Sequence, residues 1–280
     1  MWSYNDIDVY ITPTENVLGE VSVDTNNWTA LSLYGLVRGR PKLTPSTVTA
    51  NGLEIPGRDG TTYQVDSRRG NAKIEFEILI ADEWVHRQLE REKPEIAGLS
   101  VRERTDIVFS LCNLMKRVAW KCPGRDADSY FLVYKVKLTP TDGYDVAQVI
   151  KVELEVHPFE WFFEGNKPEL TEVKSLTVEN PIPFSVCKPV YVFQGTGSIT
   201  VTNTTTGASG TVSATAYPGN LEVVLDTWKQ IAYTKENTLN ANRFLNGEYS
   251  NLWIFEGEEV EITHNFTNEI TVYTRKGIIR

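Results

Sequence analysis

The chain has 280 residues, with 28 lysines and arginines against 37 aspartates and glutamates, and so a formal net charge of −9. This length suits one large domain or two ordinary ones. The acidic balance argues against a dedicated DNA- or RNA-binding protein, which would carry a basic face or arm. The start, MWSYNDIDVY, lacks the basic and apolar regions of a secretory signal, so we expect a protein that stays in the cytosol where it is made or leaves it by a route other than a signal peptide. Three scattered cysteines form neither a disulfide framework nor a zinc site.

Strand patterns dominate the first half. Apolar and charged residues alternate over 73–80, 130–138 and 150–156, which is typical of antiparallel strands with one side in water. Residues 100–118 instead place apolar side chains on one helix face, and Ser100 followed by Glu103 is a capping-box signature at its start. We therefore expect a helix over 100–118, preceded by a shorter one at about 82–91.

The second half contains short strands separated by Gly, Asn, Thr and Pro. A linker begins after a strand that ends near Val156, and we place the division between domains 1–165 and 166–280. No helical pattern is present beyond it, and this spacing of strands predicts a β-sandwich. The expected strands are 190–193, 199–202, 211–216, 221–226, 231–233, 252–255, 260–264 and 270–275.

Templates for catalysis are missing from the sequence. There is no G-x-S-x-G elbow, no Walker A motif, no G-x-G-x-x-G after a strand and no H-E-x-x-H, and the three histidines lie far apart. We predict no enzyme, no catalytic residue, no metal site and no cofactor.

Four aromatic residues of the second half are candidates for binding sugar. Trp228, Tyr233, Tyr249 and Trp253 could stack on sugar rings if they shared an open face. Packing in the core of a sandwich is the simpler interpretation, because Trp and Tyr are common there.

The most distinctive segment is a tight turn that carries two charges. In IPGRDGTTY, Gly57 and Gly60 flank Arg58 and Asp59 after a proline. Such a turn is either a plain hairpin connector or a contact in which the charged pair meets a neighbouring subunit. Charged pairs set register better than they add affinity, so we take these four residues as candidates for a subunit interface.

The sequence resembles the distal tail (Dit) proteins of phages with long, non-contractile tails. The resemblance rests on IPGRDGTTY followed by AKIEFEILI, on HPFEW at 157–161, and on VYVFQGTGSITV at 190–201. It continues in FLNG with LWIFEG at 244–257 and in RKGII at 275–279. The order of these motifs along the chain carries more weight than any one of them.

The resemblance implies a mainly-β protein with two parts. The N-terminal part would be an α+β domain with a helix and a split-barrel or belt-like sheet that forms a hexameric ring. The C-terminal part would be a galectin-like β-sandwich. The ring would lie at the virion tail tip, join the tail tube protein to tail-tip or tail-fibre proteins, and let DNA pass without binding it specifically.

A ring forms when the same contact between neighbouring copies, repeated with a fixed rotation, leads back to the first copy. We expect an exposed strand edge, such as the one at Lys73–Ile80, to pair with a neighbour's edge. Two alternatives stay open: an adhesion module of the tail tip that binds host surface saccharides, and a hydrolase that degrades cell wall.

Overall fold

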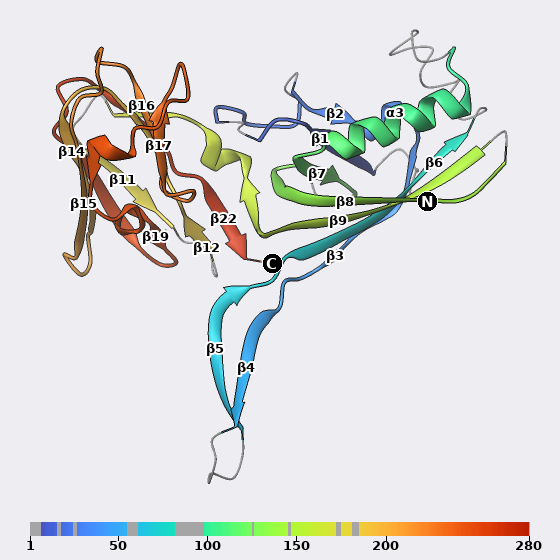
Figure 1. Cartoon of the computed structure of the whole chain (residues 1–280), viewed down its shortest axis with the longest axis horizontal. Coiled ribbons are helices and arrows are strands. Elements are labelled where there is room, and N and C mark those ends of the chain that lie inside the picture. The colour runs from blue at the N-terminus through green and yellow to red at the C-terminus, as the bar shows by residue number, and fades with distance from the viewer. Residues whose placement is uncertain are drawn as a thin grey trace. The chain divides into compact units, whose positions relative to one another are not determined.

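The computed structural model describes residues 7–15, 18–24, 27–54, 61–81, 98–124, 126–144, 147–171, 175–180 and 185–279. The chain divides into two compact units (Figure 1). Unit 1 comprises Met1–Asn16, Ser22–Glu160 and Arg280, and unit 2 comprises Val17–Val21 and Trp161–Ile279. Strands predominate in both, which confirms the mainly-β prediction.

Unit 1 is built on one antiparallel sheet in the order β2-β1-β7-β8-β9-β6-β3. The long strands β6, β8 and β9 are those that the alternating patterns predicted, because one face of each is apolar and the other charged. The bounds of these strands are β1 Asp8–Thr12, β2 Thr29–Ala30, β3 Leu36–Thr44, β6 Ala72–Ala81, β7 Arg117–Lys121, β8 Ser129–Tyr144 and β9 Ala147–Phe162.

A two-stranded ribbon continues from β3 and β6. Strands β4 (Val48–Glu54) and β5 (Thr61–Arg69) pair with each other and, within the described part of the chain, with no other strand. The Gly70 amide donates to the Thr47 carbonyl at 3.0 Å, where the ribbon joins the sheet. The ribbon is therefore one long hairpin interrupted at its base.

The single α-helix of the described residues is α3, Val101–Leu114, which packs over one face of the sheet (Figure 1). The predicted capping box is confirmed, since the Glu103 amide donates to Ser100 Oγ and the Ser100 amide donates to the Glu103 carboxylate. The helix ends at Leu114, however, and the prediction that it continues to residue 118 was wrong. Arg117–Lys121 pairs instead with β1 and β8, and its β-branched and aromatic side chains suit that strand.

The core of unit 1 lies between α3 and the sheet. Ile74, Ile78 and Ile80 of β6 are fully buried in one cluster that also contains Val108 and Cys112 of the helix. Because successive strand residues point to opposite faces, Lys73, Glu75 and Glu77 of β6 must lie on the other side. The second predicted helix, at about 82–91, lies outside the described residues.

Unit 2 contains two five-stranded antiparallel sheets, in the orders β10-β21-β13-β16-β17 and β11-β20-β14-β15-β18. The bounds of the first are β10 Glu169–Thr171, β13 Val190–Phe193, β16 Val223–Asp226, β17 Ile231–Thr234 and β21 Ile270–Tyr273. Those of the second are β11 Ser175–Glu179, β14 Gly197–Asn203, β15 Ser209–Ala214, β18 Leu245–Asn246 and β20 Glu259–His264. One apolar core gathers residues from both sheets, including Tyr191, Leu225, Ile262 and Val272.

Three more short strands pair in the order β19-β12-β22. They are β12 Ser185–Cys187, β19 Ile254–Phe255 and β22 Lys276–Ile279. Short 3-10 helices connect the strands of the chain, namely η2 Leu31–Leu33, η3 Phe163–Asn166, η4 Asn242–Phe244 and η5 Tyr249–Leu252.

The expected linker after Val156 is a continuation of strand β9. This strand runs through Pro158 to Phe162, and burial goes on alternating along it, with Pro158 and Glu160 buried. Glu160 accepts a hydrogen bond from Ser129 Oγ at 2.6 Å, which ties the end of β9 to the start of β8. The described helices include none that is long and apolar enough to cross a membrane.

Candidate functional site

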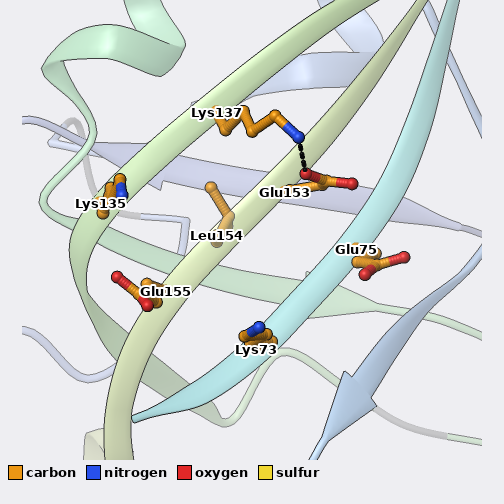
Figure 2. A pocket seen from close by; sticks show the side chains of 7 residues that line it. All are labelled: Lys73, Glu75, Lys135, Lys137, Glu153, Leu154 and Glu155. Atoms are coloured by element: carbon orange, nitrogen blue, oxygen red, sulfur yellow. Dashed lines mark hydrogen bonds and ion pairs between the residues drawn. The ribbon is translucent and has the colours of Figure 1, made fainter.

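The face of the unit 1 sheet opposite α3 is a lattice of lysines and glutamates. A pocket of about 240 Å³ lies on this face over β6, β9 and β8. Figure 2 shows the side chains that line it. Apart from Leu154, the residues that line it are charged: Lys73, Glu75, Lys135, Lys137, Glu153 and Glu155.

Strand register sets this pattern. Lys73 lies opposite Glu155, and Glu75 lies opposite Glu153, in the antiparallel pair of β6 and β9. The next pair on this face joins Glu77 with Lys151. Opposite charges at facing positions stabilise a sheet, whereas two facing carboxylates repel each other, so the Glu75–Glu153 pair needs a nearby cation.

Lys151 and Lys137 supply that positive charge. Lys151 Nζ lies 3.4 Å from Glu75 Oε2 and 2.6 Å from Glu153 Oε1, and Lys137 Nζ lies 2.8 Å from Glu153 Oε2 (Figure 2 shows the Lys137 contact). Hydrogen bonds from Lys137 and then Lys151 lower the pKa of Glu153 to about 2. The bond to Glu153 raises the pKa of Lys151.

The lattice is therefore a mutually neutralised surface. Lys137 and Lys151 are paired with carboxylates of the same face, and lysines and glutamates alternate across it, so it offers no concentrated positive field to an anion. Among the described residues no cluster of three or more His, Cys, Asp or Glu side chains could hold a metal ion.

The predicted interface residues Gly57, Arg58, Asp59 and Gly60 lie outside the described residues. The strands that flank them are described: Glu54 pairs with Thr61 at the end of the β4–β5 ribbon. The role of these four residues in a subunit contact stays a prediction.

The expectation that Lys73–Ile80 offers a free edge was wrong. Strand β6 pairs with β3 on one side and with β9 on the other, so its backbone hydrogen bonds are used inside the sheet. The outer strand on this side is β3, whose register shifts between Arg38 and Lys42, at Gly39 (φ +74°) and Pro41. A bulge and a proline are devices that prevent strand addition, so β3 is a poor substitute for the expected edge.

The four aromatic candidates for sugar binding occupy separate places in unit 2. Trp228 is half-buried, and its ring centroid lies 5.1 Å from that of Trp161. Tyr233 packs beside Val190, Val192 and Val224 on one sheet.

The other two candidates lie nearer the second sheet. Tyr249 packs against the core in η5, and Trp253 follows directly after it. The Trp253 indole donates to the Thr227 carbonyl at 3.1 Å, and the Lys188 ammonium lies 4.4 Å from its ring centroid. Sugar binding by the four together stays a prediction.

No sequence pattern predicted these lysines and glutamates as one surface. Alternation placed Lys135, Lys137, Glu153 and Glu155 on charged faces, but it could not tell which strands are neighbours. The register of β6 against β9 comes from pairing across more than 60 residues of chain, and no local signal encodes it.

Comparison with solved structures finds this fold in a phage protein. The crystal structure of the SPP1 Dit protein, described as a paradigm of the hub adsorption apparatus in phages that infect Gram-positive bacteria, matches with a TM-score of 0.53 at 12% identity. The match covers 89% of this chain and 96% of that one. Chains of the phage P2 baseplate in its activated conformation, with Ca or Sr, give TM-scores of 0.49 and 0.48 at 10% and 11% identity, each covering 96% of this chain and 97% of the other. No family model matches the sequence, and no curated protein matches it. The chain thus has the fold of a phage distal tail protein, as the order of its motifs led us to expect.

Proposed function

We propose that this chain is a structural hub protein of a phage tail tip, without enzymatic activity. The observation that carries the proposal is the fold shared with the SPP1 Dit protein over 89% of this chain and 96% of that one. In this proposal six copies form a ring at the virion tail tip, which joins the tail tube protein to tail-tip or tail-fibre proteins and lets DNA pass. A net charge of −9 suits a conduit, because a strongly basic lumen would hold phosphates by counterion release.

The β4–β5 ribbon is the part of unit 1 best suited to the contact between copies. A two-stranded ribbon by itself is marginally stable in water, and its strands have no further strand partner within the described part of the chain. A neighbouring subunit would supply the missing contact. The turn that carries Arg58 and Asp59 connects these two strands, so it would be presented to the neighbour.

The experiment compares the full chain with a variant that lacks the ribbon. Thr47 and Gly70 are already joined by a backbone hydrogen bond, so residues 48–69 can be replaced by an Asn-Gly turn that keeps β3 paired with β6. We expect the full chain to have six times the monomer mass of 31.7 kDa by native mass spectrometry and to give closed rings by electron microscopy.

The variant without the ribbon is expected to be a folded monomer with an unchanged β-sheet spectrum. A double variant, Arg58→Ala with Asp59→Ala, tests the turn alone and should weaken the ring. A full chain that stays monomeric at micromolar concentration, or a ring that survives loss of the ribbon, contradicts the proposed assembly.

A further inference from the structure

An open pocket of about 290 Å³ lies on unit 2, away from the charged lattice. Three segments that are distant in sequence form it: the hairpin between β14 and β15, the helix η5, and the residues around β19 that lead into β20. Pockets that combine aromatic side chains with a few fixed polar groups are the usual form of small-ligand sites.

Two aromatic rings give the pocket an apolar platform. Phe255 is 52% exposed, and its ring centroid lies 6.5 Å from that of Trp253, with the planes at 63°. Trp253 is held by its hydrogen bond to the Thr227 carbonyl and by the Lys188 ammonium above its ring. Trp253 is therefore held in place before any ligand arrives, which lowers the entropic cost of binding.

Hydrogen-bonding groups stand beside the platform. Asn251 is exposed, and its side-chain amide has no hydrogen bond to any residue that the structure describes. An amide offers both a donor and an acceptor, and the hydroxyls of Ser250 and Ser209 line the same pocket. These groups can pair with hydroxyls of a ligand.

The charge of the pocket selects against anions. Glu258 is the one charged side chain among the described residues that line it. Its Oε1 accepts from Asn203 Nδ2 at 3.1 Å and its Oε2 accepts from the Phe255 amide at 2.7 Å. The carboxylate is thus used in hydrogen bonds within the pocket wall. No lysine or arginine is among the described residues that line the pocket, so none is available there to bind an anion.

The walls of the pocket are fixed by close backbone contacts. A side chain at Gly210 would come within 2.4 Å of the Asn251 carbonyl oxygen, so the glycine lets η5 lie directly on β15. In the connection between β14 and β15, Asn203 Oδ1 accepts from the amides of Thr205 and Thr206 at 3.0 and 2.8 Å. The arrangement is a built site rather than a gap between loops.

We propose that this pocket binds a neutral saccharide. A pyranose ring has an apolar C–H face that would stack on Phe255 and Trp253, while its hydroxyls would pair with Asn251 and the two serines. Of the four aromatic residues that the sequence offered as sugar-binding candidates, Trp253 alone lines the pocket. The inference goes beyond the hub role, and ring assembly neither requires it nor follows from it.

The test uses the full chain and saturation-transfer NMR with four neutral sugars: glucose, galactose, N-acetylglucosamine and rhamnose. Glucuronate serves as the charged comparison, and a short aromatic peptide serves as the alternative kind of ligand. Native mass spectrometry of the same sample reports assembly, so loss of sugar binding and loss of the ring are separate readouts.

We expect at least one neutral sugar to bind at millimolar concentration and to protect part of the tryptophan fluorescence from quenching. Phe255→Ala and Asn251→Ala should each weaken binding about tenfold or more, and Phe255→Trp should retain it. Tyr134→Ala removes a similarly exposed aromatic ring from unit 1 and should leave binding unchanged. The proposal is overturned if none of the four neutral sugars gives a signal. It is also overturned if neither pocket variant weakens binding, or if the protein prefers glucuronate or the peptide.

Discussion

Glu75 and Glu153 stand directly opposite each other on β6 and β9, and the Lys151 ammonium lies 3.4 Å from one carboxylate and 2.6 Å from the other. One lysine thereby compensates a repulsive cross-strand pair. Because the hydrogen bonds of Lys137 and Lys151 hold the pKa of Glu153 at about 2, any stabilisation from this cluster is present above the ordinary pKa of 4.5 and is lost as pH falls toward 2.

Replacing Lys151 by methionine should raise the pKa of Glu153. Glu153 then faces the carboxylate of Glu75, and Lys137 is the one remaining lysine that donates to it. Carboxyl ¹³C NMR titration measures the midpoint directly. Lys121→Met is the control, since its ammonium lies 4.0 Å from Asp126, outside the lattice. An unchanged Glu153 midpoint in Lys151→Met would show that the bridge does not operate in solution.

Tyr191→Phe should leave unit 2 as stable as before, or stabilise it by up to about 1 kcal/mol. The Tyr191 hydroxyl is buried in the core and has no hydrogen-bond partner among the described residues, and burial raises its pKa. Removing an unsatisfied polar atom therefore removes a desolvation cost. Urea unfolding of both proteins gives the difference in the free energy of unfolding.

Ser129→Ala is the contrasting change in unit 1. Ser129 Oγ donates to the buried Glu160 carboxylate at 2.6 Å, so the alanine variant should lose about 1–3 kcal/mol. Destabilisation by Tyr191→Phe that equals the loss in Ser129→Ala would mean that the tyrosine hydroxyl has a partner in solution.

Local patterns in the sequence predicted the local structure well. Alternation found β6, β8 and β9, and the Ser100–Glu103 pair located the start of α3. Both signals act within a few residues of chain. The end of the helix was mispredicted because Val118 fits a helical face as well as a strand, and pairing with distant β1 decides between them.

Contacts between distant segments could not be predicted in the same way. The interior position of β6 depends on two partners, β3 and β9, that no local pattern identifies. The pocket on unit 2 depends on Gly210 meeting Asn251, some 40 residues away, and its exposed Phe255 belonged to a predicted strand with no sign of a site. Composition alone made Trp253 a candidate without showing what lies beside it.

Asp226→Asn should destabilise unit 2 by about 3 kcal/mol or more. Asp226 Oδ1 lies 2.9 Å from Arg275 Nη1, and both side chains are buried. An asparagine can still accept from the amides of Trp228 and Lys229, which the aspartate holds at 3.1 Å each, but it leaves a buried guanidinium without its counter-charge.

The matched control is Glu222→Gln, which breaks an exposed pair of similar length. Lys235 Nζ lies 2.6 Å from Glu222, with both side chains about half exposed, so the loss should be at most about 1 kcal/mol. Thermal unfolding followed by tryptophan fluorescence compares the two variants. Equal losses would contradict a special role for burial.

Lys188→Met should remove a rise in stability at alkaline pH. Burial lowers the pKa of Lys188 to about 8 from 10.5, so between these values the unfolded chain binds more protons than the folded one. The free energy of unfolding must then increase as pH rises through this window, by about 1 kcal/mol for this lysine.

Urea unfolding at about pH 7 and about pH 9.5 measures the change in each protein. Other groups that titrate in this range, the buried Cys112 among them, contribute equally to both proteins, so the difference between the two isolates Lys188. The same slope in both proteins would mean that the ammonium above Trp253 is as well solvated as an ordinary surface lysine.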